Sequence, residues 1–489
     1  FDINNSDILY VGTDGGVYRS WNKGTTMEIV ENLPLSQFYH ISVDNETPYN
    51  VYGGLQDNGS WYGPSAAPGG ITAKHWKPVG QGDGFRVLRH PKKNIIYSEM
   101  QGAENVWRYD VENKLIKTIQ PLPVAGDEEY RFNWNAPIAT SSNKPDRLYI
   151  GSQYLHKSEN MGDSWEIISP DLTTNDPEKQ NQENSGGLST DNSGAENHTT
   201  VFTIAESSLD ENVIWVGTDD GNIQVSSDGG NTWTNTIKNV KGVPKNTWVY
   251  HIEASSHDSK TAYVVFDGHT SGDMNAYAYK TTDLGKTWKN IIPSNDVYGF
   301  VRNIQEDYKD PNLLFLGTEF GLYITINGGD SWSKFRKNMP SVAVHYIDLQ
   351  KNTNDLVMGT HGRGVIIIDD ISPLREINEE SLSGKLFFFK KDQFTMRDQS
   401  GFSDSFGIET QFVGENPSNA FQLKYLLPKR HTFGKMTLEI QDLDGKTVAK
   451  LSPGKSKGIN IVHWGYRIKA PKIAKGKTFS FGGFTSPRI

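Results

Sequence analysis

Acidic side chains recur in short glycine-rich turns between segments rich in β-branched and aromatic residues. The carboxylates that we regard as candidate catalytic groups are Asp57, Asp83, Glu196, Asp219 and Glu319. An inverting glycosidase needs two carboxyl groups about 6.5–9.5 Å apart, one of them protonated. The sequence does not select a pair among these five. Glycoside hydrolysis is therefore a hypothesis without an assigned acid and base.

Amide and basic side chains and one more aspartate occupy the same kind of turn and are candidates for ligand binding. They are Gln56, Asn58, Asp220, His361 and Arg363. Arg363 lies between two glycines, which leave its guanidinium free for a carboxylate or a ligand, and a buried internal ion pair is the alternative. Aspartates beside glycine also cap their own turns, and that alternative stays open for Asp14, Asp57 and Asp219.

Composition excludes several classes of site and partner. The chain has no cysteine, and its 12 histidines form no HExxH pattern, so we expect no metal and no cofactor. Lys plus Arg is 49 against 58 Asp plus Glu, a formal net charge of -9, which argues against a nucleic-acid partner. No apolar run approaches the ~20 residues of a membrane span. The loops hold no arginine triad of the sialidase kind.

One supersecondary pattern positions these turns. A β-branched or aromatic strand, a Gly-Thr or similar step, a tight turn and a second strand recur at the spacing of propeller blades. An alternating strand precedes all but the first copy. The sequence therefore predicts an all-β protein, a β-propeller with seven four-stranded blades favoured. The eight hairpins are Ile8–Ser20, Asn50–Tyr62, Ile95–Asp110, Leu148–Ser158, Val213–Ser227, Thr261–Thr281, Leu313–Thr325 and Leu356–Asp369.

A second motif, Ser/Thr-x-Asp/Asn-x-Gly-x-Ser/Thr-Trp, follows several of the hairpins. The Asp or Asn should cap backbone N–H groups, the Gly supplies a positive φ, and the Trp fills the gap between blades. We expect these residues to be structural rather than a sugar-stacking surface. The copies are Asn160 with Trp165, Asp228 with Trp233, Asp283 with Trp288 and Asn327 with Trp332, and a degenerate copy has Asn22 with Met27.

The motif resembles the Asp-box, or bacterial neuraminidase repeat, over roughly residues 1–372. Five stretches are similar to the bacterial sortilin-like and xyloglucanase-like propellers: Leu33–Ser65, Val79–Phe85, Ser185–Thr199, Val216–Trp233 and Gly359–Arg375. The resemblance implies two propellers in tandem and an extracellular, cell-surface or periplasmic protein. Residues 1–35 would then end an upstream propeller of the same chain and 36–372 form a second one. A single eight-bladed ring, or part of a ten-bladed one, is the alternative.

The C-terminal part differs in pattern. After a polar linker, 373–384, residues 385–489 carry alternating strands and an Asp-Leu-Asp-Gly turn typical of a hairpin. This segment resembles the Ig-like β-sandwich of flagellar hook-capping proteins without its last strand.

Propeller geometry orders these residues by face. Turns between the second and third strands, and loops between blades, share one face, and the Asp/Asn turns lie on the other. We favour an exported or surface binding or scaffold protein, not an enzyme, that engages protein, peptide or glycan on the first face. The alternative is a glycoside hydrolase acting on a polysaccharide in a cleft between tandem propellers.

Overall fold

The computed structural model describes residues 1–13, 15–181, 197–293, 296–391 and 411–466. The chain divides into two compact units. The first comprises Phe1–Asp370 and takes in a short later segment that ends at Gly414, and the second holds the remaining C-terminal part. None of the helices in the described ranges has the length and hydropathy needed to cross a membrane.

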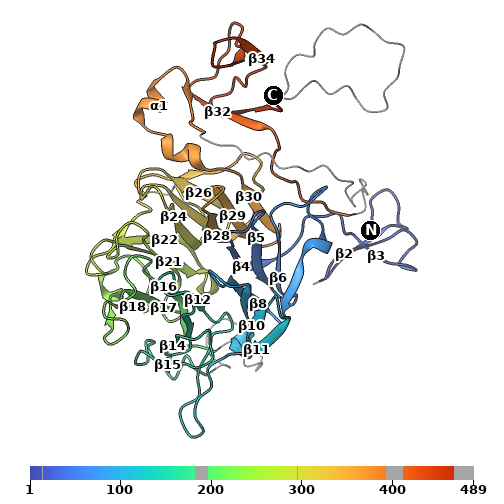
Figure 1. Cartoon of the computed structure of the whole chain (residues 1–489). Coiled ribbons are helices and arrows are strands. Elements are labelled where there is room, and N and C mark those ends of the chain that lie inside the picture. Colours follow the sequence, from blue (N-terminus) through green and yellow to red (C-terminus); the bar gives the residue numbers. More distant parts are fainter. Residues whose placement is uncertain (14, 182–196, 294–295, 392–410, 467–489) are drawn as a thin grey trace. The chain divides into compact units, whose positions relative to one another are not determined.

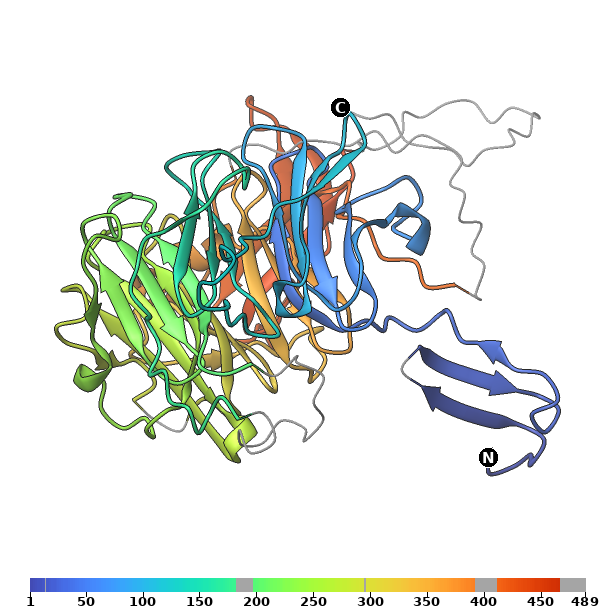
Figure 2. The ribbon, with the colours of Figure 1, turned by 90° about the horizontal axis from the view of Figure 1, so that it is seen from below.

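The first unit contains a β-propeller built of successive antiparallel sheets, here called blades 1 to 7. Figure 1 and Figure 2 show them following the chain from blue through green to orange. Blades 1 to 6 have four strands and blade 7 has three. Blade 1 consists of β4(Phe38–Val43), β5(Asn50–Leu55), β6(Gly59–Pro64) and β7(Lys77–Gly80), blade 2 of β8(Gly84–Arg89), β9(Ile95–Met100), β10(Val106–Asp110) and β11(Leu115–Thr118), and blade 3 of β12(Ile138–Thr140), β13(Leu148–Gly151), β14(Leu155–Ser158) and β15(Glu166–Ile167). Blade 4 consists of β16(Val201–Glu206), β17(Ile214–Thr218), β18(Ile223–Ser226) and β19(Thr234–Asn235), and blade 5 of β20(Trp248–Ala254), β21(Ala262–Gly268), β22(Asp273–Thr281) and β23(Lys289–Asn290). Blade 6 consists of β24(Val301–Glu306), β25(Leu314–Thr318), β26(Gly321–Thr325) and β27(Ser333–Lys334), and blade 7 of β28(Val344–Gln350), β29(Asp355–Thr360) and β30(Val365–Ile368).

The ring of blades is closed. The innermost strand of each blade contacts that of the next, and β28 of blade 7 packs on β4 of blade 1. Gln37 pairs with His361 in a bridge, and the Ser36 carbonyl accepts hydrogen bonds from the N–H groups of Gly362 and Gly364. The predicted seven-bladed propeller is therefore confirmed, except that blade 7 has three strands among the described residues.

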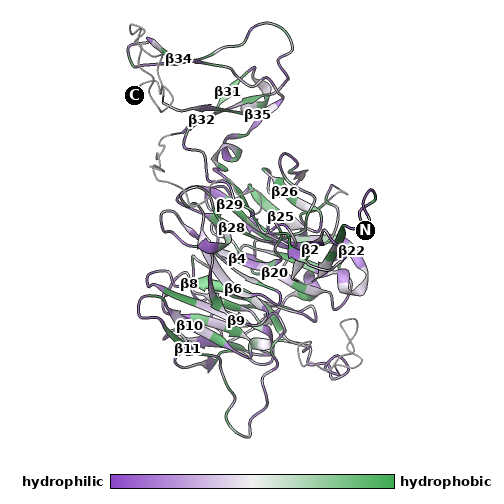
Figure 3. Ribbon diagram, turned by 90° about the vertical axis from the view of Figure 1, so that its right-hand side faces the viewer, coloured by the Kyte–Doolittle hydropathy of each residue, from purple (hydrophilic) through white to green (hydrophobic). Residues whose placement is uncertain are grey.

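The core lies between the blades, because each sheet is covered on both faces. All five residues of β17 are buried, and Figure 3 shows that the blade strands carry much of the apolar sequence. The glycine of the repeated Gly-Thr step marks the closest approach of two blades. A Cβ on Gly217 would lie 2.4 Å from Val249 Cγ1 of the next blade, and one on Gly151 would lie 2.4 Å from Val201 Cγ1. Glycine at this step is thus required by packing.

The Asp/Asn turns have the predicted hydrogen bonds. Asp228 Oδ1 accepts from the Thr232 N–H at 2.9 Å, and Ser226 Oγ accepts from the Gly230 N–H at 2.9 Å. Each tryptophan donates to the preceding blade: Trp233 to the Ile168 carbonyl at 3.0 Å and Trp332 to the Ile291 carbonyl at 2.6 Å. These tryptophans connect neighbouring blades, as predicted.

Three strands before the ring, β1(Leu9–Thr13), β2(Gly16–Ser20) and β3(Glu28–Ile29), form a sheet of their own, dark blue in Figure 2. The turn between β2 and β3 is the degenerate copy of the motif, and it has the same bonds. Asn22 Oδ1 accepts from the Thr26 N–H at 2.9 Å, and Ser20 Oγ accepts from the Gly24 N–H at 2.8 Å. The sheet therefore has the turn that joins the two outer strands of a blade.

The second unit has five described strands. β31(Phe387–Phe388), β32(Phe421–Leu427) and β35(Gly458–Trp464) form one sheet, and β33(Leu438–Gln441) pairs with β34(Thr447–Leu451) across the predicted Asp-Gly turn. Its core contains Tyr425, Leu427 and Val462. The similarity to an Ig-like sandwich remains a prediction.

The predicted linker is partly helical. It contains a 3-10 turn at Ser372–Glu376 and α1(Glu379–Ser383). Asn378 explains the helix, because its side chain accepts a hydrogen bond from the Ser381 N–H.

Candidate ligand-binding face

The antiparallel order of the strands gives the propeller two faces. The turns between the second and third strands lie at the same end of the blades as the blade-to-blade loops, and we call this end the ligand face. The Asp/Asn turns join the third and fourth strands and so lie at the opposite end. The candidates Asp57, Asp83, Glu319, His361 and Arg363 belong to the ligand face by this topology. Asp14 and Glu196 fall outside the described residues.

The innermost strands carry a β-bulge where they begin, at the ligand face. It occurs in six of the seven blades, in the ranges that the structure describes. Between Val249 and His251, for example, the pairing with β21 skips one residue, Tyr250. A bulge changes the direction of a side chain that, in a regularly alternating strand, would point toward a neighbouring blade. The bulged residues, here named the bulge ring, are Tyr39, Phe85, Phe202, Tyr250, Arg302 and His345.

The side chains of the bulge ring contact one another across blades. The ring centres of Tyr39 and Phe85 are 4.5 Å apart, and those of Tyr39 and His345 are 6.4 Å apart. The Phe202 and Tyr250 rings are 5.0 Å apart, and the Arg302 guanidinium lies 4.5 Å from the Tyr250 ring centre. Residues far apart in sequence thus form one aromatic and cationic cluster.

Arg302 is held in a fixed network. Its Nε lies 3.1 Å from Asp267 Oδ2, and it donates to the Tyr250 hydroxyl. Its Nη2 lies 3.3 Å from His269 Nε2, and His269 Nδ1 lies 2.8 Å from Asp267 Oδ1. Because a guanidinium only donates, His269 Nε2 must accept, and Nδ1 carries the proton. The His269 ring also stacks on that of Phe300, with the ring centres 4.5 Å apart.

A pair of carboxylates borders the bulge ring. The Asp57 N–H donates to Asp83 Oδ1 at 2.6 Å. Burial, together with the neighbouring Asp57, raises the pKa of Asp83 above the ordinary range of an aspartate. Trp134 also interacts with Asp83, and its ring lies 5.8 Å from Tyr39 and 5.1 Å from Phe85. Asp83 is thus a carboxyl group that retains its proton to higher pH, next to the half-buried rings of Tyr39 and Trp134.

Amide groups extend this border. Gln56 Oε1 accepts from the Tyr39 hydroxyl at 2.7 Å and from Gln37 Nε2 at 2.8 Å. Asn58 is exposed, and its Nδ2 donates to the Gln56 carbonyl at 2.8 Å.

The structure does not bring Asp219 and Asp220 into this cluster as accessible groups. Both are 1% exposed. Asp219 accepts from the N–H of Thr200 at 2.8 Å and from Asn133 Nδ2 at 3.0 Å, and Asp220 accepts from Thr174. Their partners belong to blade-to-blade loops, so neither carboxylate is confined to capping its own turn. Each fixes a loop of the ligand face.

The remaining candidates lie near Arg302 or at the surface. Glu319 is half-buried and interacts electrostatically with Arg302. The His361 ring is 4.5 Å from that of His345, and burial, helped by the charge of Arg302, lowers the pKa of His361. Arg363 is exposed rather than buried in an ion pair, and its N–H donates to Thr360 Oγ1 at 3.1 Å.

The sequence analysis missed the bulge ring because it searched turns and not the first residues of the inner strands. A signal was present. Five inner strands share a four-residue pattern at or next to their first residue: an apolar residue, then the bulged residue, then a residue with a polar group, then Ile. The five sequences are FYHI, VFTI, VYHI, VRNI and VHYI. An aromatic or basic residue at the second position of each repeat interrupts the regular alternation.

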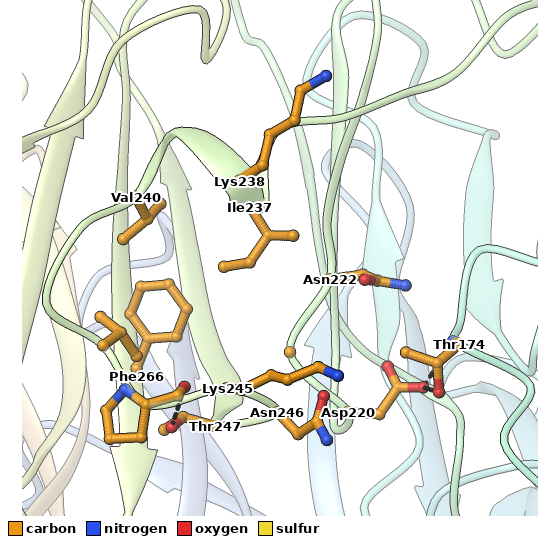
Figure 4. A pocket seen from close by; sticks show the side chains of 13 residues that line it. Thr174, Asp220, Asn222, Ile237, Lys238, Val240, Lys245, Asn246, Thr247 and Phe266 are labelled. Atoms are coloured by element: carbon orange, nitrogen blue, oxygen red, sulfur yellow. Dashed lines mark hydrogen bonds between the residues drawn. The ribbon is translucent and has the colours of Figure 1, made fainter.

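A pocket of about 350 Å³ opens between blades 4 and 5 (Figure 4). Ile237, Val240 and Phe266 form an apolar wall, and Asn222 and Lys245 lie on the polar side. Within the described ranges, no group of three His, Asp or Glu side chains is placed to hold a metal ion.

Comparisons with known proteins point to glycan-acting proteins. No family model matches the chain. It is 26% identical over 229 residues to the oligoxyloglucan-reducing end-specific xyloglucanase of Emericella nidulans, and 25% identical over 254 residues to a probable enzyme of the same name in Neosartorya fischeri. These matches cover 43% and 49% of this chain, but only 24% and 28% of the relatives.

Solved structures with a similar chain trace are a GH74 xyloglucanase from Xanthomonas campestris and YCF48 from Cyanidioschyzon merolae. The first has 15% identity and a TM-score of 0.48, covering 69% of this chain and 52% of that one. The second has 13% identity and a TM-score of 0.45, covering 68% of this chain and 94% of that one. The fold assignment rests on the strand order and ring closure described above. The chain is a β-propeller protein whose sequence resembles xyloglucanases over less than half its length.

Proposed function

We propose that this chain is part of a glycan-acting protein, and that its ligand face binds a neutral polysaccharide of the xyloglucan class. The observation that carries the proposal is the half-buried group of Tyr39, Trp134, Gln56 and Asp83 at the bulge ring. The Phe85, Phe202, Tyr250 and His345 side chains of the ring are almost completely buried and support this group from below. Sugar rings present C–H groups to aromatic faces and hydroxyl groups to carboxylates, amides and guanidinium groups. The sequence similarity to xyloglucanases supports a glycan over a protein or peptide ligand.

Hydrolysis is the activity that we propose for the whole protein. Asp83 is the proposed proton donor, because burial raises its pKa as a general acid requires. Glu319, which interacts with Arg302, is the proposed second carboxylate. Asp57 is too close to Asp83 for an attacking water to fit between the two carboxyl groups, because their side chains interact directly. The whole protein would act outside the cell, where such polysaccharides occur.

Binding is tested by affinity electrophoresis of the 489-residue chain in gels containing xyloglucan, with hydroxyethylcellulose and galactomannan as comparison polysaccharides. We expect xyloglucan to retard the wild type and the Trp134→Ala variant to lose most of the retardation. Tyr308→Ala is the control, since Tyr308 follows the first strand of blade 6 and so lies at the opposite face. Equal mobility with and without every polysaccharide would contradict the proposal.

Hydrolysis is tested separately by release of reducing ends from xyloglucan oligosaccharides. Asp83→Asn should abolish release while retaining electrophoretic retardation, whereas Asp228→Asn, on the opposite face, should retain both. Retardation without any release by the wild type would leave a glycan-binding protein and refute catalysis by this chain.

A further inference from the structure

Directly after the bulge ring, the inner strands place a second set of side chains inside the propeller. We call this set the inner layer, and its members are His40, Arg86, Thr203, His251, Asn303 and Tyr346. His40 is 4% exposed, His251 7% and Asn303 0%. The Tyr346 ring lies 5.0 Å from that of His40 and 5.5 Å from that of His251. The layer therefore joins blades 1, 5 and 7 in one polar interior cluster.

Arg86 brings a positive charge into this cluster. Its Nη1 donates to Asn135 Oδ1 at 2.8 Å and to the Ala136 carbonyl at 3.1 Å, and its Nη2 donates to the Phe202 carbonyl at 3.2 Å. The N–H of Nε and the second N–H of Nη2 have no partner among the described residues. Three of the five donors thus bind neutral oxygens, and two remain available.

No described carboxylate forms an ion pair with this guanidinium. Glu99, which interacts electrostatically with Arg86, is 0% exposed, and its Oε1 accepts from the backbone N–H of Arg86 at 2.9 Å. Its buried Oε2 has no partner among the described residues. Burial also raises the pKa of Glu99 well above its ordinary value, which favours its neutral form. Arg86 is half-buried, and a charge withdrawn from water without a counter-charge is costly.

The histidines of the layer add donors. Asn135 Oδ1 accepts from Arg86, and the same amide lies within hydrogen-bond distance of His40 Nε2, through Nδ2 at 3.0 Å and Oδ1 at 3.1 Å. With Nε2 accepting from Nδ2, as an anion site requires, the proton of His40 is on Nδ1, and this buried atom has no partner among the described residues. Nδ1 of His251 and both Nδ2 and Oδ1 of Asn303 are also buried and have no partner among the described residues. Burial lowers the pKa of His251 to about 3, so it too is neutral near pH 7.

We propose that the inner layer binds one small monovalent anion, chloride, through the free N–H groups of Arg86 and the Nδ1–H of His40, with His251, Asn303 and Tyr346 around it. The cluster offers a cation and several N–H donors, while burial favours the neutral form of the Glu99 carboxyl group, whose Oε1 accepts from the Arg86 backbone N–H. His40, Thr203, His251 and Asn303 are almost completely buried and Arg86 and Tyr346 are half-buried, which favours a single-atom ion over a carboxylate or phosphate. The anion would neutralise Arg86 and link the inner strands from inside, independently of any glycan at the ligand face.

The first test measures the melting temperature of the wild type in sodium chloride and in sodium gluconate at equal ionic strength. Chloride that binds only the folded chain should raise the melting temperature in proportion to the logarithm of its concentration. Equal melting temperatures in the two salts would overturn the proposal.

The second test uses the line width of ³⁵Cl NMR, which increases when chloride exchanges with a protein site. The wild type should broaden the line, and Arg86→Met should weaken binding at least about tenfold, the equivalent of 1.4 kcal/mol. Arg89→Met, on the same strand β8 but outside the layer, is the matched control and should broaden it as the wild type does.

If Arg86→Met does not fold, crystals of the wild type soaked in bromide decide the question. An anomalous peak beside Arg86 and His40 supports the site. A peak elsewhere, or none there, refutes it.

Discussion

Asp267 Oδ2 of blade 5 lies 3.1 Å from Arg302 Nε of blade 6, and the two side chains join neighbouring blades at the ligand face. Asp267 is 3% exposed, and its other oxygen accepts from both the N–H and Nδ1 of His269. The carboxylate therefore orients a cation and an imidazole at once.

Asp267→Asn should destabilise the propeller by about 3–5 kcal/mol, the range for removing one partner of a buried pair. The amide can still accept from His269 but cannot neutralise Arg302. Asp330→Asn is the control, because Asp330 pairs with Lys289 at 3.2 Å with side chains 68% and 72% exposed, and about 0–1 kcal/mol is expected there. Urea unfolding of both variants measures the difference, and equal losses would contradict the assignment.

The tryptophans of the Asp/Asn turns should differ in their contribution to stability. Trp332 is 6% exposed, whereas Trp233 is half-buried. Trp332→Ala should cost about 3–5 kcal/mol, the range for emptying a large aromatic site, and Trp233→Ala should cost less. Thermal unfolding of the two variants checks the order. No detectable shift for Trp332→Ala would show that the ring does not hold blades 5 and 6 together.

Gly217→Ala tests the contact between blades 4 and 5. The added Cβ would meet Val249 Cγ1 at 2.4 Å and Thr203 Cγ2 at 2.7 Å, so the inner strands must shift. Overpacking of this kind costs about 1–3 kcal/mol. Gly12→Ala is the matched control, because Gly12 occupies the same Gly-Thr step in the first hairpin and a Cβ there meets nothing within 4 Å. A loss of stability in Gly12→Ala as large as in Gly217→Ala would contradict this explanation.

The sequence predicts the propeller well because its signals are local and repeated. Each Asp/Asn turn needs only residues within eight positions, such as Ser226 to Trp233, and each Gly-Thr step reports one close approach of blades. The ligand face is harder to predict, because Tyr39, Trp134 and Arg302 meet only through ring closure. Asp219 shows the same limit: a turn position suggested an accessible carboxylate, and loops from other blades bury it.

The free energy of unfolding should depend on pH through the half-buried acid Glu253. Burial, with the neighbouring charges of Glu306 and Asp348, raises the pKa of Glu253 to about 8. An unfolded glutamate has a pKa near 4.3, so between about pH 4.3 and pH 8 the folded chain holds a proton that the unfolded chain has released. The contribution of Glu253 to the free energy of unfolding is therefore fully present below about pH 4.3. It falls as the pH rises toward about 8, by at most about 1.4 kcal/mol per pH unit.

Glu253→Gln should remove this dependence. The Gln305 Nε2 group, which donates to Glu253 Oε1 at 2.6 Å, can donate equally to an amide oxygen. We expect the variant to match the wild type near pH 5 and to exceed its free energy of unfolding at pH 8, measured by urea titration at both values. Glu104→Gln, an exposed acid, should follow the wild type. A wild type that loses no more stability than Glu253→Gln between pH 5 and pH 8 would show that Glu253 is ionised in the folded chain, with Gln305 as its sufficient partner.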